Sequence, residues 1–197
     1  MKKQIIFLII VLFAIAVNSQ KLKIIKGGLE ALEGVSEYNI VFDYSNITIA
    51  QYDSEEAFLK DKMKLREDKE RGAGVKFKKQ WFSNRDSLYE PKFIKYFNDF
   101  FTSKTKIKVM KDGNAKYTML INTVFVYPGY NVGVWGEESK LKATITVYEA
   151  ESPDNIIFTT KEVYVKGRAT YNSKNRIANS YIFLARRIAA YLRRKTF

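Results

Sequence analysis

The sequence has no cysteine and no histidine among its 197 residues. The lack of cysteine excludes disulfide bonds, a thiolate nucleophile and the acylated cysteine of a bacterial lipoprotein. The lack of histidine excludes imidazole metal ligands and the Ser-His-Asp triad. Proline is also rare, with three residues, and no linker rich in proline, glycine or serine divides the chain. We therefore predict one domain that is stabilised by a hydrophobic core.

One long apolar run lies near the N-terminus, at residues 5–17, and a lysine pair at residues 2 and 3 precedes it. It fits the apolar region of a signal peptide and is shorter than the roughly 20 residues that span a bilayer. Val17 and Ser19 suit the −3 and −1 positions of a cleavage site, so residues 1–19 are predicted to be removed and residues 20–197 to form the domain. The alternatives are an uncleaved membrane anchor and a buried N-terminal helix. We expect an exported protein, periplasmic or secreted, that is not a lipoprotein and has no further transmembrane segment.

Four segments have the alternation, or the β-branched and aromatic content, of β-strands. They span residues 38–44, 117–127, 140–149 and 156–166. Residues 152–155 read Ser-Pro-Asp-Asn, a combination typical of turns. The last two strands are therefore predicted to form a hairpin.

Helical patterns occupy the region between the first two strands. Asp53 and Glu56 have the spacing of a capping box that opens a charged, largely exposed helix over residues 54–71. A second helix is predicted over residues 77–88, and Pro91 suits the first turn of a third helix with a strong aromatic stripe.

The chain closes with an amphipathic helix that Asn172 or Ser173 is predicted to cap. One face carries apolar side chains at helical spacing: Ile177, Tyr181, Leu184, Ile188 and Leu192. Together with the strands, these helices predict an α+β fold, with a mixed or antiparallel sheet of about four strands and amphipathic helices packed on one face.

Positive charge dominates the sequence, with a net charge of +13. Residues 166–197 contain nine basic and no acidic residues. Arg176, Arg187 and Arg194 share one flank of the predicted last helix and form a candidate electropositive strip. Such a strip would bind an anionic envelope surface, such as lipopolysaccharide or anionic lipid; the alternative is an ordinary solvated face. Nucleic acid also fits the charge, but export makes it an improbable partner, and we predict none.

An unusual segment, Tyr127–Gly136, combines three large aromatic residues with glycine and proline between two predicted strands. Glycine and proline account for the turn, but they do not account for Tyr130 and Trp135. These rings either plug the end of the sheet or form a contact surface. With Tyr127 and Asn131 they make up the second candidate binding site.

The sequence contains no glycine-rich phosphate loop, no nucleophile elbow and no zinc-protease motif. We therefore predict no catalytic, cofactor-binding or metal-binding residues, and a non-enzymatic binding module. The alternative is an accessory enzyme that acts on carbohydrate or polymer through acidic residues whose positions the sequence does not reveal.

Three segments carry a resemblance to known proteins: residues 90–98, 115–123 and 127–134. They resemble those of a family of small secreted bacterial proteins of unknown function. Over residues 38–192 the order of elements is also similar, more distantly, to the N-terminal domain of the periplasmic protein TolB and related exported or lipoprotein domains. The resemblance implies a helix-covered sheet and an adaptor role in an envelope complex. The expected partner is then an envelope protein or an anionic envelope surface.

Overall fold

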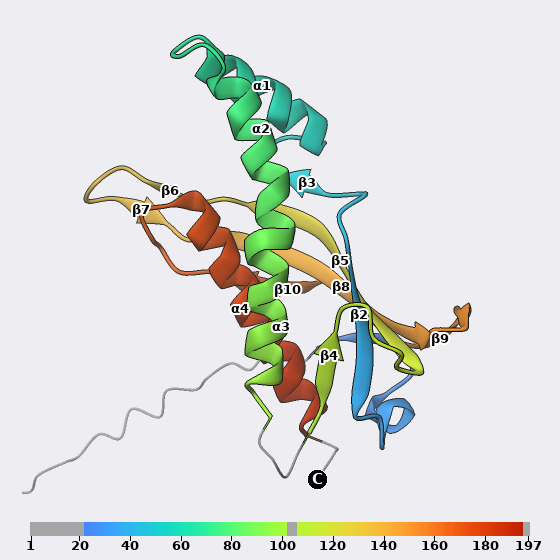
Figure 1. Ribbon diagram of the computed structural model, residues 1–197. Coiled ribbons are helices and arrows are strands. Elements are labelled where there is room, and N and C mark those ends of the chain that lie inside the picture. The colour runs from blue at the N-terminus through green and yellow to red at the C-terminus, as the bar shows by residue number, and fades with distance from the viewer. Residues whose placement is uncertain (1–21, 102–105, 195–197) are drawn as a thin grey trace, which may run out of the picture.

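The computed structural model describes residues 22–101 and 106–194. The predicted signal peptide, residues 1–19, lies outside the described residues. Within them the chain forms one large mixed β-sheet and four α-helices (Figure 1). The predicted α+β class is therefore confirmed.

The main sheet has eight strands among the described residues, in the order β1-β9-β8-β5-β2-β4, with β10 beside β8 and β3 beside β5. The strands are β1 (Ile24–Lys26), β2 (Glu37–Asp43), β3 (Thr48–Ile49), β4 (Lys108–Met110), β5 (Tyr117–Tyr127), β8 (Lys140–Glu149), β9 (Ser152–Thr160) and β10 (Val163–Lys166). Parallel pairing joins β2 to both β4 and β5, whereas β5, β8 and β9 are antiparallel neighbours. The prediction of about four strands is wrong, because β1, β3 and β4 are too short to show alternation and the strand predicted over 156–166 is divided between β9 and β10.

The connection between β8 and β9 also differs from the prediction. The turn lies at Ala150 and Glu151, and β9 already begins at Ser152. Pro153 is accommodated within β9 because the register shifts between the pairs Glu149↔Ser152 and Tyr148↔Ile156. A proline lacks the N–H that a ladder needs, and a bulge at the start of a strand tolerates this lack. The predicted turn over 152–155 is therefore wrong.

The predicted helices are present with altered boundaries. They are α1 (Glu55–Glu67), α2 (Ala73–Asn84), α3 (Glu90–Asn98) and α4 (Ser173–Leu192), with a π-helical turn at Arg85–Tyr89 that joins α2 to α3. Ser54, and not Asp53, caps α1, since its hydroxyl accepts a hydrogen bond from the Ala57 N–H at 3.1 Å. Of the two expected capping residues of α4, Asn172 is the cap. Its side-chain oxygen accepts a 3.0 Å hydrogen bond from the Lys174 N–H.

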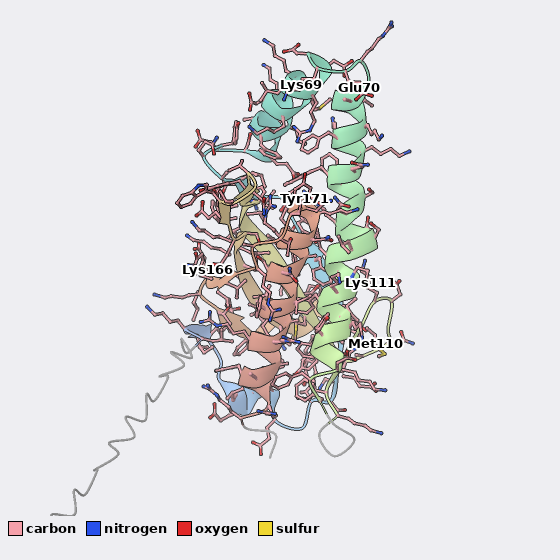
Figure 2. The ribbon with its side chains drawn as sticks, turned by 90° about the vertical axis from the view of Figure 1, so that its left-hand side faces the viewer. Lys69, Glu70, Met110, Lys111, Lys166 and Tyr171 are labelled. Atoms are coloured by element: carbon pink, nitrogen blue, oxygen red, sulfur yellow. The ribbon has the colours of Figure 1, made fainter. Side chains whose placement is uncertain are left out.

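Helices α3 and α4 pack together on one face of the sheet (Figure 1). All five stripe residues predicted for α4 are buried, as are Phe93 and Phe97 of α3. Helices α1 and α2 instead extend beyond the sheet as an arm, residues 55–84, whose far end is marked by Lys69 and Glu70 (Figure 2). The placement of helices on one face thus holds for α3 and α4 and not for the arm.

Candidate binding surface at the β6–β7 hairpin

A small hairpin projects from the main sheet between β5 and β8 (Figure 1). Its strands, β6 (Tyr130–Asn131) and β7 (Gly136–Glu137), pair antiparallel in a second sheet. The Val132 N–H donates to the Trp135 carbonyl at 2.8 Å and closes the loop. Gly133 supplies the left-handed conformation that this loop needs, with φ of 83°. The segment 127–136 is therefore an ordered hairpin.

The end of this hairpin exposes large apolar side chains. Trp135 is 72% exposed and Val134 is 93% exposed, and Tyr130 and Val132 are also exposed. Tyr171, which is 88% exposed, precedes α4 and lies at the N-terminal end of that helix (Figure 2). We call these five residues the apolar patch. A plug would be buried, so the alternative in which Trp135 closes the end of the sheet is wrong.

Arg176 connects the two segments that carry the apolar patch. Its side chain is buried, with 4% of the residue exposed, although it belongs to the first turn of α4. The guanidinium donates to the carbonyls of Pro128 and Gly129 in the hairpin base, at 2.9 and 3.1 Å. It also donates to the carbonyls of Thr170 and Tyr171. The planar fork of arginine thus fastens the hairpin to the segment before α4.

This burial overturns part of the predicted electropositive strip. Arg176 faces the hairpin base, where burial lowers the pKa of its guanidinium, and it presents no charge to an outside partner. Arg187 lies further along α4 and donates to the Tyr164 carbonyl at 2.7 Å, at the edge of the sheet. Arg194 is exposed at the end of the helix. The three side chains therefore form no continuous strip.

Two serines and a glycine, which the sequence analysis did not single out, lie beneath the Arg176 contact. The Ser139 hydroxyl donates to the Arg176 carbonyl at 2.5 Å and lies 2.7 Å from the Ser180 hydroxyl. A Cβ atom at Gly167 would lie 2.3 Å from the Ser139 Oγ and 2.5 Å from the Arg176 carbonyl oxygen. Small residues at all three positions let α4 approach the ends of β8 and β10. In the sequence, the position of Gly167 directly after a predicted strand was the only indication of this close packing.

The base of the hairpin is held by charged and aromatic groups. The Tyr127 hydroxyl donates to Glu137 at 2.6 Å, and the Lys140 ammonium contacts the other carboxylate oxygen at 2.6 Å. Hydrogen bonds from Lys140 and Tyr127 lower the pKa of Glu137, and the bond to Glu137 raises the pKa of Tyr127 to about 12. Asn131 accepts a bond from the Gly133 N–H at 3.2 Å. Of the predicted site residues, Tyr127 and Asn131 thus shape the hairpin, and Tyr130 and Trp135 face outward.

The described residues contain no cluster of three or more metal-ligating side chains, and none of their helices is long and apolar enough to cross a membrane. Among the described residues, Glu90 is the buried carboxylate, and the sequence analysis did not identify it. It forms an ion pair with Lys111 and accepts a 3.2 Å hydrogen bond from Tyr44. These contacts give Glu90 a structural role where α3 meets the sheet.

Comparisons with known proteins leave the family open. No family model and no curated protein matches this chain. Among solved structures, the PelC dodecamer from Paraburkholderia phytofirmans is similar at a TM-score of 0.41 and 9% identity, covering 85% of this chain and 97% of that chain. A protein from Xanthomonas campestris of the family DUF330 is similar at a TM-score of 0.38 and 10% identity, covering 85% and 90%. At these scores the function has to be inferred from the chain's own residues.

Proposed function

We propose that this chain is a non-enzymatic binding module of the bacterial cell envelope, and that it docks on a partner through the apolar patch. The observation that carries the proposal is the exposure of Val134 and Trp135 on an ordered hairpin, together with that of Tyr171 before α4. Contiguous exposed apolar residues mark interaction sites, and tryptophan and tyrosine are enriched among the residues that dominate binding energy.

The charges around the patch favour a protein partner over an anionic membrane. Glu137 lies 2.6 Å from Lys140, and Glu138 lies 3.8 Å from Lys166, so these two lysines at the hairpin base each have a carboxylate neighbour. A mixed polar rim around an apolar centre is typical of protein interfaces. An anionic bilayer would instead be expected to select unpaired lysines and arginines beside the inserted residues. We therefore propose an envelope protein with an apolar pocket that accepts the end of the hairpin.

The Arg176 contact supports this proposal energetically. A hairpin that is already ordered loses little conformational entropy when it binds, so more of the contact energy appears as affinity. Four carbonyl contacts from one buried guanidinium hold the hairpin relative to α4. The patch is thus presented in one geometry before any partner arrives.

The test compares two double variants that each replace two exposed apolar residues. Val134→Ser with Trp135→Ser alters the patch, and Leu65→Ser with Val75→Ser alters the arm. Crosslinking in the native envelope, followed by mass spectrometry, identifies the partner, and titration with that purified partner measures the affinity. We expect the patch variant to bind about thirtyfold more weakly and the arm variant to bind normally, at unchanged melting temperatures.

Two outcomes would contradict the proposal. One is a partner that binds the patch variant with unchanged affinity. The other is sedimentation with anionic phospholipid vesicles that the patch variant loses and that no envelope protein competes for, because this would make a membrane the partner. An activity on carbohydrate that survives in both variants would favour the accessory enzyme.

A further inference from the structure

A groove of about 1070 Å³ lies at the edge of the sheet where β9 ends and β10 begins. Strand β9 follows β8 as far as the pair Thr146↔Thr159, and β10 resumes at Val163↔Ala143. In the gap, the Thr160 hydroxyl accepts a 3.0 Å hydrogen bond from the Ile145 N–H. The predicted single strand over 156–166 is therefore interrupted at 161–162, and the interruption opens the groove.

The sides of the groove are largely apolar. Leu22 and Ile25 come from β1 and the residues before it, and Val163 and Tyr164 come from β10. Ile25 is 63% exposed, although it is a large aliphatic residue in a strand. Its exposed surface provides a wall against which an alkyl chain can bury apolar area.

Three cations line the same groove: Lys23, Lys161 and Arg187. Glu162 is the acidic residue of the lining. Its carboxylate forms an ion pair, at 3.1 Å, with Lys142, which does not line the groove. Among residues 22–101 and 106–194, no carboxylate lies within 4 Å of the Lys23 or Lys161 ammonium. The groove thus combines apolar walls with an excess of positive charge.

The contact of Arg187 argues against an added β-strand as the occupant. The Gly167 N–H bonds to the Ser139 carbonyl, so the antiparallel alternation directs the Tyr164 carbonyl away from β8. The Arg187 guanidinium bonds to this outward carbonyl at 2.7 Å. An incoming peptide strand would need the same acceptor. Arg187 therefore occupies the carbonyl that an added strand would need, and its positive charge remains beside the groove.

We propose that this groove binds a single-chain anionic amphiphile, such as a long-chain carboxylate. The alkyl chain lies along Leu22, Ile25 and Val163, and the anionic head meets the ammonium groups of Lys23 and Lys161. The volume of about 1070 Å³ lies slightly above the 300–1,000 Å³ that is common for small-molecule sites, so the groove has room for a long alkyl chain together with its head group. The site is separate from the apolar patch and does not depend on its function.

Fluorescence titration of the exported protein with dansyl-undecanoic acid tests the proposal. We expect saturable binding that palmitate displaces, with hexadecanol and hexanoate at least about tenfold weaker, because one lacks the charge and the other lacks the chain. Lys23→Glu with Lys161→Glu is expected to weaken binding about tenfold, as is Ile25→Glu alone. The matched control, Lys76→Glu with Lys79→Glu, changes two exposed lysines of the arm and is expected to bind normally.

Several results would overturn this assignment. They are the absence of saturable binding, equal displacement by hexadecanol and palmitate, or unchanged affinity in both groove variants at unchanged circular dichroism. Stronger displacement by a two-chain anionic lipid, or by an acidic extended peptide, would assign the groove to a different occupant. Loss of probe binding in the Val134→Ser, Trp135→Ser variant and not in the groove variants would move the site to the apolar patch.

Discussion

Replacement of Arg176 by alanine gives the sharpest test of how the apolar patch is held. Its guanidinium is buried and donates four hydrogen bonds to backbone carbonyls. Bonds from a charged donor contribute about 1.5–3 kcal/mol each. Water can reach carbonyls at a hairpin base once the side chain is removed, so about 1 kcal/mol for each bond is the appropriate scale. The free energy of unfolding is therefore expected to fall by about 4 kcal/mol.

For a domain of this size, 1 kcal/mol shifts the melting temperature by about 2–4 °C, so Arg176→Ala is expected to melt about 8–16 °C lower. Arg176→Lys keeps the charge and loses the planar fork, and it is expected to recover about half of this difference. Circular dichroism measures the melting temperatures. Hydrogen exchange in residues 127–137 reports the local effect, which we expect to be an increase of at least about tenfold.

Arg186→Ala is the matched control, because Arg186 is exposed on the same helix and its guanidinium lies 5.0 Å from the centre of the Tyr96 ring. An exposed cation–π contact is worth about 0.5–1 kcal/mol, so this variant is expected to melt within about 4 °C of the unmodified protein. If Arg176→Ala melts as the control does and residues 127–137 exchange at the normal rate, the proposed role of Arg176 is refuted.

Three further predictions concern single positions. Gly167→Ala is expected to destabilise the fold by about 1–3 kcal/mol in urea unfolding, because its Cβ would lie 2.5 Å from the Arg176 carbonyl oxygen. The lowered pKa of Glu137 means that its contribution to the hairpin is present above the usual glutamate range and is lost as the pH falls through the lowered value. Hydrogen exchange in the hairpin should therefore accelerate on acidification, and Glu137→Gln should remove that dependence. Ser54→Ala is expected to cost about 1 kcal/mol by loss of the α1 cap, in contrast to Asp53→Ala, which should cost little.

Local patterns were sufficient for the long elements. Strands β2, β5 and β8 and helix α4 each expose one face to the core over seven or more residues, so alternation or helical spacing is repeated enough to be read. The exposed character of α1 followed from its thin apolar content in the same way. Strands of two or three residues contain hardly one repeat of the pattern, and this is why β1, β3 and β4 were missed.

The candidate site shows the same division. Sequence composition was enough to single out Tyr130 and Trp135, because a turn does not need large aromatic side chains. Whether they are buried or exposed depends on what the hairpin packs against, and only the tertiary structure decides this. The structure places both rings in solvent.

Arg176 is the clearest case of a property that the sequence does not contain. A helical wheel gives the direction of a side chain around its own axis, and on that basis Arg176 belongs with Arg187 and Arg194. What lies beyond the helix surface depends on contacts between residues 128–129 and α4, which are almost 50 positions apart in the chain. The zero count of cysteine and histidine and the +13 charge were properties of the sequence by itself. The structure alone decided which charges are buried, because burial depends on how distant segments pack together.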